Sequence, residues 1–189
     1  MNQRDDQRRQ LSGPTGSGVR WIGLSLLLGA TLSHAQTAPP LELPATSKLV
    51  PLSSSAVPGS VAFSGSTTIH AILVAQWVAN ADGDGHSGPS YQLLPVPLSA
   101  AQMPHFAGAP LKFITVSNGP AILAKATSPQ IAKAFDARAL GVVHVEGLYS
   151  IQAYTLGGRC ARAGVAEVVD VDPVRVRYPG RPEPIDCPA

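Results

Sequence analysis

Between Val61 and Trp77 the sequence alternates apolar and polar side chains, and this pattern constrains the fold more than any other feature of the 189-residue chain. Successive side chains of a β-strand point to opposite faces, so a period of two predicts one long strand with a buried face. Gly65 interrupts the apolar face and predicts a bulge or a sharp bend in that strand.

Similar strand signals follow, separated by turn residues. The segment 80–89 is rich in Asn, Asp, Gly and Pro, which predicts a turn, and Pro95 and Pro97 should end the next strand or place it at an edge. The chain has 18 Gly, 18 Pro and only 5% aromatic residues, a mixture that suits short strands joined by many turns. The further strands are expected at 91–98, 111–116, 143–152 and 165–176.

One helix is expected. Asn118-Gly119-Pro120 is interpreted as a turn that ends the third strand. Ser128-Pro129 then predicts a helix start, because Ser can accept a hydrogen bond from a free N–H group and Pro suits the first helical position. Apolar residues continue at helical spacing to Leu140, and Gly141 lies where a left-handed C-terminal cap is expected.

The resulting order is strand, strand, strand, helix, strand, strand. This order is typical of an OB-fold, a five-stranded partly open barrel, over residues 61–178. The run Leu140-Gly-Val-Val-His-Val-Glu-Gly147 and the strand Tyr91-Gln92-Leu93 resemble small exported bacterial OB-like domains of unknown function. The resemblance implies a mainly β fold and no functional residues. A small β-sandwich or β-roll with one helix is the alternative architecture.

The N-terminus has the three parts of a secretory signal peptide. Four arginines in the first 20 residues precede an apolar run at 21–32, and Ser33-His34-Ala35 supplies small residues before a cut between Ala35 and Gln36. The apolar run is shorter than the roughly 20 residues that cross a bilayer. The sequence therefore predicts a periplasmic or secreted protein, by the general route or, through Arg8-Arg9, the twin-arginine route. No cysteine follows the apolar run, so no lipid-modified cysteine is expected there.

Two terminal segments flank the predicted β domain. Residues 36–60 contain five prolines and are expected to form a flexible arm. Residues 179–189 are expected to form a tail held by a disulfide between Cys160 and Cys187, the only two cysteines. Such a bridge stabilises a fold by roughly 2–4 kcal/mol.

The charge balance changes when the signal peptide is removed. The whole chain has 14 basic and 12 acidic residues, but four arginines and two aspartates lie in residues 1–35, which leaves ten of each sign. A nucleic-acid-binding OB-fold needs a basic groove with aromatic side chains. The neutral balance and the few aromatics argue against nucleic acid as a partner.

The turn at 80–89 contains the candidate ligands Asp82, Asp84 and His86. Alternating oxygen ligands and a Gly resemble the start of a Ca²⁺ loop. Counted from Asn80, however, position twelve, where such a loop has Glu, is Tyr91. A solvated hairpin connection is the favoured interpretation, and the sequence predicts no metal site and no cofactor.

Catalytic patterns are incomplete. Gly85-His86-Ser87-Gly88-Pro89 resembles a serine-nucleophile loop, but it does not complete G-x-S-x-G, so no catalytic residue is assigned. His70 and His144 lie on predicted strands that a barrel could bring together, although polar-face positions are the simpler explanation. Acidic and arginine residues interleave near the last strands and predict cross-strand charge pairs on a solvated face: Glu146, Glu167, Asp170, Asp172, Arg159, Arg162, Arg175 and Arg177.

These observations predict an exported, non-enzymatic domain that binds a partner in the bacterial cell envelope. The alternative is a periplasmic protein that binds a small ligand or a metal through Asp82, Asp84 and His86. A hydrolase is the third and least favoured function.

Overall fold

The computed structural model describes residues 39–53, 57–79, 87–158 and 160–179. The predicted signal peptide and its cleavage site at Ala35 and Gln36 lie outside the described residues. The elements in chain order are β1 (Leu41–Glu42), β2 (Val50–Pro51), β3 (Ser60–Ser64), β4 (Ser66–Ala79), β5 (Ser87–Pro95), α1 (Pro97–Ala101), β6 (His105–Phe106), β7 (Phe113–Val116), α2 (Gly119–Ala126), α3 (Pro129–Asp136), β8 (Val142–Gly157) and β9 (Ala163–Arg177).

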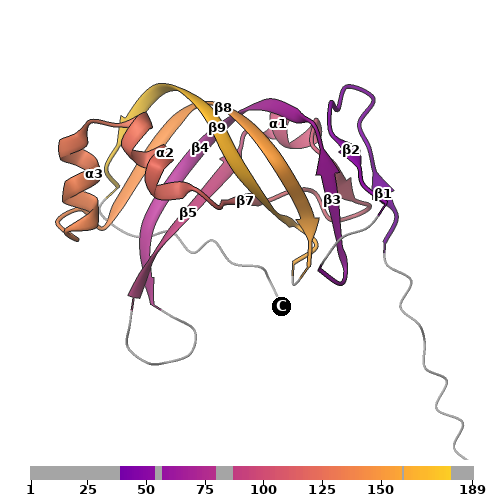
Figure 1. Cartoon of the computed structure of the whole chain (residues 1–189), viewed down its shortest axis with the longest axis horizontal. Coiled ribbons are helices and arrows are strands. Elements are labelled where there is room, and N and C mark those ends of the chain that lie inside the picture. The colour runs from indigo at the N-terminus through magenta and orange to yellow at the C-terminus, as the bar shows by residue number, and fades with distance from the viewer. Residues whose placement is uncertain (1–38, 54–56, 80–86, 159, 180–189) are drawn as a thin grey trace, which may run out of the picture. The chain divides into compact units, whose positions relative to one another are not determined.

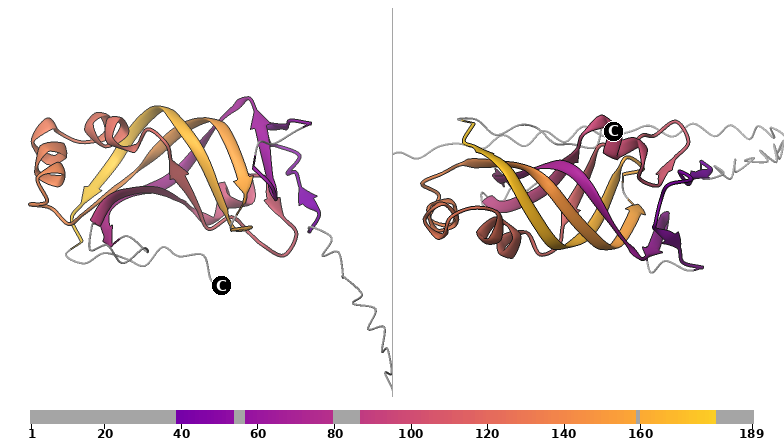
Figure 2. Two further views of the ribbon diagram at one scale, coloured as in Figure 1. Left: turned by 60° about the horizontal axis from the view of Figure 1, so that its bottom comes forward. Right: turned by 90° about the horizontal axis from the view of Figure 1, so that it is seen from above.

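Five strands pair in a ring. β4 pairs with β5 and β8, β5 pairs with β7, β7 runs parallel to β9, and β9 pairs back onto β8. The strands cross obliquely as they wrap around the core (Figures 1 and 2). β7 and β5 share only two paired positions, so the ring is partly open there. The predicted mainly β fold with a partly closed ring of strands is confirmed, and helices α2 and α3 lie between the third and fourth strands of the ring.

Gly65 separates β3 from β4, as the interrupted pattern predicts. Its φ is +93°, which favours glycine, and a Cβ atom there would lie 2.6 Å from the carbonyl oxygen of Lys48. The chain therefore bends, and β3 continues beside the far end of β8 while β2 pairs with β3. The seven-stranded sheet that results is an extended ring rather than a clean barrel.

The core fills the inside of the ring with alternate residues of each strand. On β4 the buried positions include Ile69, Ala71, Leu73 and Ala75, which are four of the apolar positions of the period-two pattern. β8 contributes a matching inner row: Val143, Val145, Tyr149 and Ile151. The alternation thus identifies correctly which face of β4 and of β8 is inside.

Helix α3 begins where the sequence predicts. Ser128 is the N-cap, its Oγ accepts a hydrogen bond from the N–H of Ile131 at 3.4 Å, and Pro129 occupies the first turn. The predicted C-terminal end is wrong, because the helix stops at Asp136. Arg138 takes the left-handed conformation with φ +58° and its guanidinium lies 4.3 Å from the centre of the Trp77 ring, so the cap is not at Gly141.

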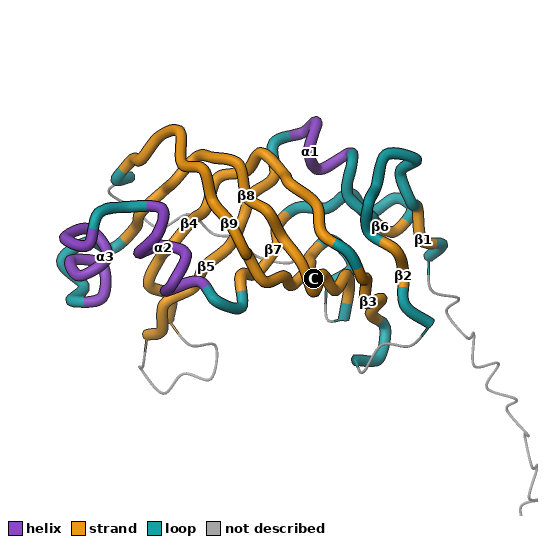
Figure 3. Tube along the Cα trace, turned by 45° about the horizontal axis from the view of Figure 1, so that its top comes forward, coloured by secondary structure: helices purple, strands orange, loops and turns teal. Residues whose placement is uncertain are grey.

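Three helices occur in the described part of the chain instead of the single one expected. One of the two additional helices, α2, begins where the sequence predicts a turn. Asn118-Gly119-Pro120 does not simply end a strand, because α2 begins at Gly119, with Asn118 as its N-cap and Pro120 in its first turn. The side chain of Asn118 donates to the carbonyl oxygen of Val168 at 2.7 Å and accepts from its N–H at 3.1 Å. These two bonds hold the start of α2 against β9. Figure 3 shows α2 and α3 together at one end of the ring, and α1 apart from them.

The expected flexible arm at 36–60 is packed against the domain where it is described. β1 pairs with β6, and the carboxylate of Glu42 lies 2.9 Å from Nε2 of His105. Leu49 is buried in the core and β2 pairs with β3. Prolines limit these strands to two residues each but do not prevent the side chain of Leu49 from being buried, which is why composition alone is misleading here.

Burial raises the pKa of the Tyr149 hydroxyl well above its usual range, and this predicts sensitivity to alkali. The hydroxyl donates to the carbonyl oxygen of Val145 at 2.7 Å. The unfolded chain ionises tyrosine near pH 10, whereas the folded chain holds the proton, so stability is complete below pH ~10 and falls as the pH rises further.

We expect Tyr149→Phe to cost about 1 kcal/mol at pH 8 through the lost hydrogen bond. Above pH ~10 the free energy of unfolding should fall less steeply for the variant than for the natural chain. The difference between the two slopes should be up to about 1.4 kcal/mol per pH unit. Urea unfolding between pH 8 and 11.5 measures both effects. Equal slopes for the two proteins would contradict this account of the Tyr149 hydroxyl.

Candidate functional site

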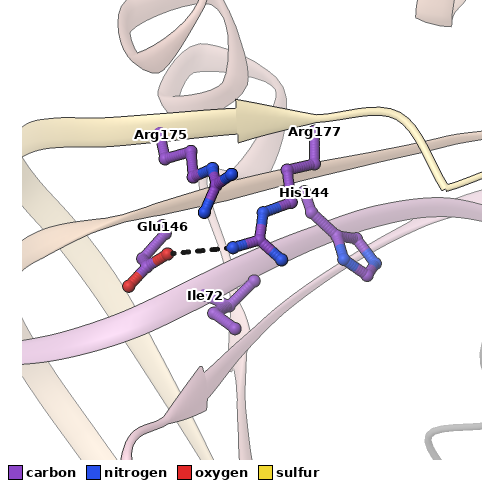
Figure 4. Close-up of a pocket in the computed structure, with 5 residues that line it drawn as sticks. All are labelled: Ile72, His144, Glu146, Arg175 and Arg177. Carbon is purple, nitrogen blue, oxygen red and sulfur yellow. Dashed lines mark ion pairs between the residues drawn. The ribbon is translucent and has the colours of Figure 1, made fainter.

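A small pocket, partly open to solvent, lies on the outer face of the ring where β4, β8 and β9 run side by side. Its walls are Ile72 from β4, His144 and Glu146 from β8, and Arg175 and Arg177 from β9. Figure 4 shows the two arginine side chains reaching from β9 across the pocket toward Glu146 and Ile72. The pocket therefore combines cationic groups, one carboxylate and one apolar wall.

Strand register brings these residues together. Arg175 is paired with Glu146, Arg177 with His144, and Ile72 with Glu146 on the other side of β8. Because side chains alternate, residues two apart on one strand share a face, so all five point to the outside while their neighbours Val143 and Val145 point into the core. The same alternation that builds the core therefore builds the site on the opposite face.

Glu146 is the centre of a small charge network. One carboxylate oxygen lies 3.3 Å from Nε2 of His70, and the other lies 3.9 Å from a terminal nitrogen of Arg177. Within the described part of the chain, Arg175 makes no ion pair. Two guanidinium groups therefore face a single carboxylate, which leaves an excess of one positive charge among these three groups.

These charges are in contact with water. The side chain of Arg177 is 57% exposed and that of Glu146 is 31% exposed. An ion pair of this kind at 3.9 Å contributes little to folding, because solvent screens it and the contact is longer than a hydrogen bond. Arg177 consequently keeps donors that can bind another anion.

The predicted cross-strand charge pairing is only partly found. Glu146 and Arg177 do come from neighbouring strands. Asp170, however, pairs with Lys125 of α2 at 2.6 Å, and the hydrogen bond from that lysine lowers the pKa of the Asp170 carboxyl. Glu167 accepts a hydrogen bond from Gln152 at 3.0 Å. Asp172 lies on β9 opposite the apolar Leu148.

Of the other two arginines of that set, the one that the structure describes lies away from the pocket. Arg162 lies in the connection between β8 and β9, where its Nε is 3.5 Å from the carbonyl oxygen of Pro110. Arg159 lies outside the described residues. Among the arginines of this set that the structure describes, Arg175 and Arg177 line the pocket.

The histidines do not form a shared site. His70 is paired with Leu148 and His144 with Val74, so the two rings are separated along the strands by the Glu146 position. His105 contacts Glu42 at a different place. No group of three or more His, Cys, Asp or Glu side chains in the described ranges could hold a metal ion.

Several predicted site residues cannot be placed. Asp82, Asp84 and His86 of the candidate ion loop lie outside the described residues, as does Cys187, so the disulfide with Cys160 stays a prediction. Ser87 starts a β-strand opposite Ala79 and does not lie on the strand-to-helix turn of a nucleophile elbow. Ser87 is not among the described residues that line the pocket on β8 and β9.

The sequence contains a signal that could have pointed to the pocket. His144-x-Glu146 and Arg175-x-Arg177 each place two polar groups on one face of a strand. Which of the interleaved charges meet depends on register, and a shift of two residues would move Arg175 away from Glu146. No helix of the described residues has the length and apolar character needed to cross a membrane. No family model, curated protein or solved structure matches the chain.

Proposed function

We propose that this protein is an exported, non-enzymatic binding module that engages an anionic component of the bacterial cell envelope. The observation that carries the proposal is the pocket on β8 and β9, where Arg175 and Arg177 outnumber the single carboxylate of Glu146. Arginine suits such a role, because its planar guanidinium presents several donors to an anion.

The location in the envelope rests on the sequence. A basic segment, an apolar run and Ser33-His34-Ala35 direct the chain to export, and the mature chain has no net charge that would favour nucleic acid. The proposed disulfide between Cys160 and Cys187 suits an oxidising compartment. A binding role also agrees with the position of the charged pocket on a rigid sheet rather than on a loop.

Capture from a detergent-solubilised envelope extract tests this function. The chain is expressed with its own signal in an exporting bacterium, with an affinity tag after Ala189, and is compared with the double variant Arg175→Gln/Arg177→Gln. We expect the natural chain to retain an envelope component and the double variant to lose it about tenfold or more, because charge-assisted bonds are removed. The retained amount should fall as salt is raised.

Arg162→Gln is the matched control, since it makes the same kind of substitution at an arginine that lies away from the pocket. Its capture should equal that of the natural chain. Equal melting temperatures of all three proteins show that the folds are intact. Identical capture by the natural chain and the double variant would overturn the proposed binding face.

A further inference from the structure

We infer that the pocket recognises a single carboxylate group that is attached to an apolar carbon, as at the C-terminus of a peptide that ends in an apolar residue. This inference rests on the proposed function and names the chemical class of its ligand. It follows from the charge, the donor geometry and the wall composition of the pocket formed by Ile72, His144, Glu146, Arg175 and Arg177.

The charge of the pocket matches an anion of one negative charge. Arg175 and Arg177 provide two positive charges, and Glu146 removes one of them. A carboxylate would bring the site to neutrality, whereas a doubly charged phosphate would leave it with an excess negative charge beside Glu146. Like charges that close together are unfavourable. The carboxylate of Glu146 thus discriminates between the two classes of anion.

The network around Glu146 orients a donor toward the ligand. His70 contacts one oxygen of Glu146 and Arg177 contacts the other, so the carboxylate lies between them. The 3.9 Å separation leaves Arg177 with donors that are not used by Glu146, and Arg175, on the same face of β9, is without an ion pair among the described residues. Two guanidinium groups two residues apart can bind the two oxygens of one carboxylate.

The apolar wall of the pocket indicates which kind of group adjoins the carboxylate of the ligand. Ile72 lines the pocket from β4, and Figure 4 shows its side chain on the side of the pocket opposite to β9. A ligand carboxylate between the arginines would place its adjoining carbons against Ile72. The pocket is small and partly open to solvent, so it would hold only the carboxylate end of the ligand, and the rest of a peptide would extend into solvent.

N-acetyl-leucine and its amide, N-acetyl-leucinamide, are the probes, because they differ only in the negative charge. Both are titrated into ¹⁵N-labelled full-length mature protein, and the backbone amide signals of Glu146, Arg175 and Arg177 are followed. We expect saturable shifts with the acid at a Kd of about 1–10 mM, a range suited to one charged contact in water, and none with the amide. Inorganic phosphate should bind more weakly than the acid.

Arg175→Gln and Arg177→Gln should each weaken binding of the acid about tenfold or more, whereas Arg162→Gln should leave it unchanged. Ile72→Ala should weaken binding of the acid about threefold to tenfold through lost apolar contact. Equal shifts with acid and amide, no shift with the acid at about ten times the expected Kd, or tighter binding of phosphate would each overturn the inference.

The outcomes separate this inference from the proposed function. If capture of an envelope component requires Arg175 and Arg177 but N-acetyl-leucine does not bind, the binding module stands and the carboxylate assignment is wrong. If N-acetyl-leucine binds as expected but capture is unaffected by the double variant, the pocket is a carboxylate site and the proposed envelope function is wrong.

Discussion

Phe135→Ala is expected to lower the free energy of unfolding by about 3–5 kcal/mol, the usual cost of removing a fully buried aromatic ring. Phe135 is the buried residue of α3, with no exposed surface. Its ring lies 5.8 Å from the ring of Trp77 and 5.9 Å from that of Tyr91. Because α3 has eight residues and would not be stable in isolation, this contact is what keeps the helix on the barrel.

Tryptophan fluorescence reports both on unfolding of the whole domain and on the surroundings of Phe135. Trp21 lies in the predicted signal peptide, so Trp77 is the only tryptophan of the mature chain. Its Nε1 donates to the carbonyl oxygen of Phe135 at 3.0 Å. Urea unfolding followed by Trp77 fluorescence should therefore give a lower midpoint in the variant, and fluorescence at low urea should shift toward the value of solvated tryptophan.

Ile131→Ala on the same helix is the control, because Ile131 is only partly buried and its loss should cost clearly less. A decrease below about 1 kcal/mol for Phe135→Ala would contradict the anchoring role, since cavities left by buried aromatic rings cost more than this.

Gly147→Ala is the second change with a large expected effect, because it forces β8 and β9 apart. A Cβ atom at Gly147 would lie 2.5 Å from the carbonyl oxygen of Asp172 and 3.0 Å from Cα of Pro173. Both neighbours are backbone atoms and cannot rotate away. The register shifts between Glu146 and Gly147, so the two strands approach closely at this bulge. We expect a loss of about 2–3 kcal/mol, the upper part of the range for overpacked sites.

The same change should affect the candidate site. Arg175 is paired with Glu146, the residue next to Gly147, so a displacement of β9 moves the arginines away from the Glu146 carboxylate. Thermal unfolding together with N-acetyl-leucine titration measures both effects. Gly141→Ala is the matched control, because a Cβ atom at Gly141 meets nothing within 4 Å. That control should be neutral or slightly stabilising, and equal effects of the two substitutions would contradict a close approach at Gly147.

Local chemistry predicted some elements well and others poorly. The start of α3 was predictable, because Ser128 and Pro129 act on the N–H groups of their own turn. The start of α2 was not, since Asn118-Gly119-Pro120 is compatible with a turn and with a helix start. The decision depends on Val168, 50 residues away, to which the Asn118 side chain is hydrogen-bonded.

The residues 41–51 show the same limit. Their prolines disfavour long strands, which the sequence does reveal. Whether Leu49 is buried, however, depends on the surface that the rest of the domain offers. The core that accepts Leu49 is built by strands that follow it in the chain, so no property of residues 41–51 predicts their packing.

By itself the sequence determined which side of β4 and of β8 is buried, because alternation with a period of two is a property of neighbouring residues. It also predicted the five strands of the ring in their chain order, but only one of the helices. Only the tertiary structure decided which charges meet. Glu146 and Arg175 are 29 positions apart, and the register of β8 against β9, set by core packing and by the close approach at Gly147, places them in one pocket.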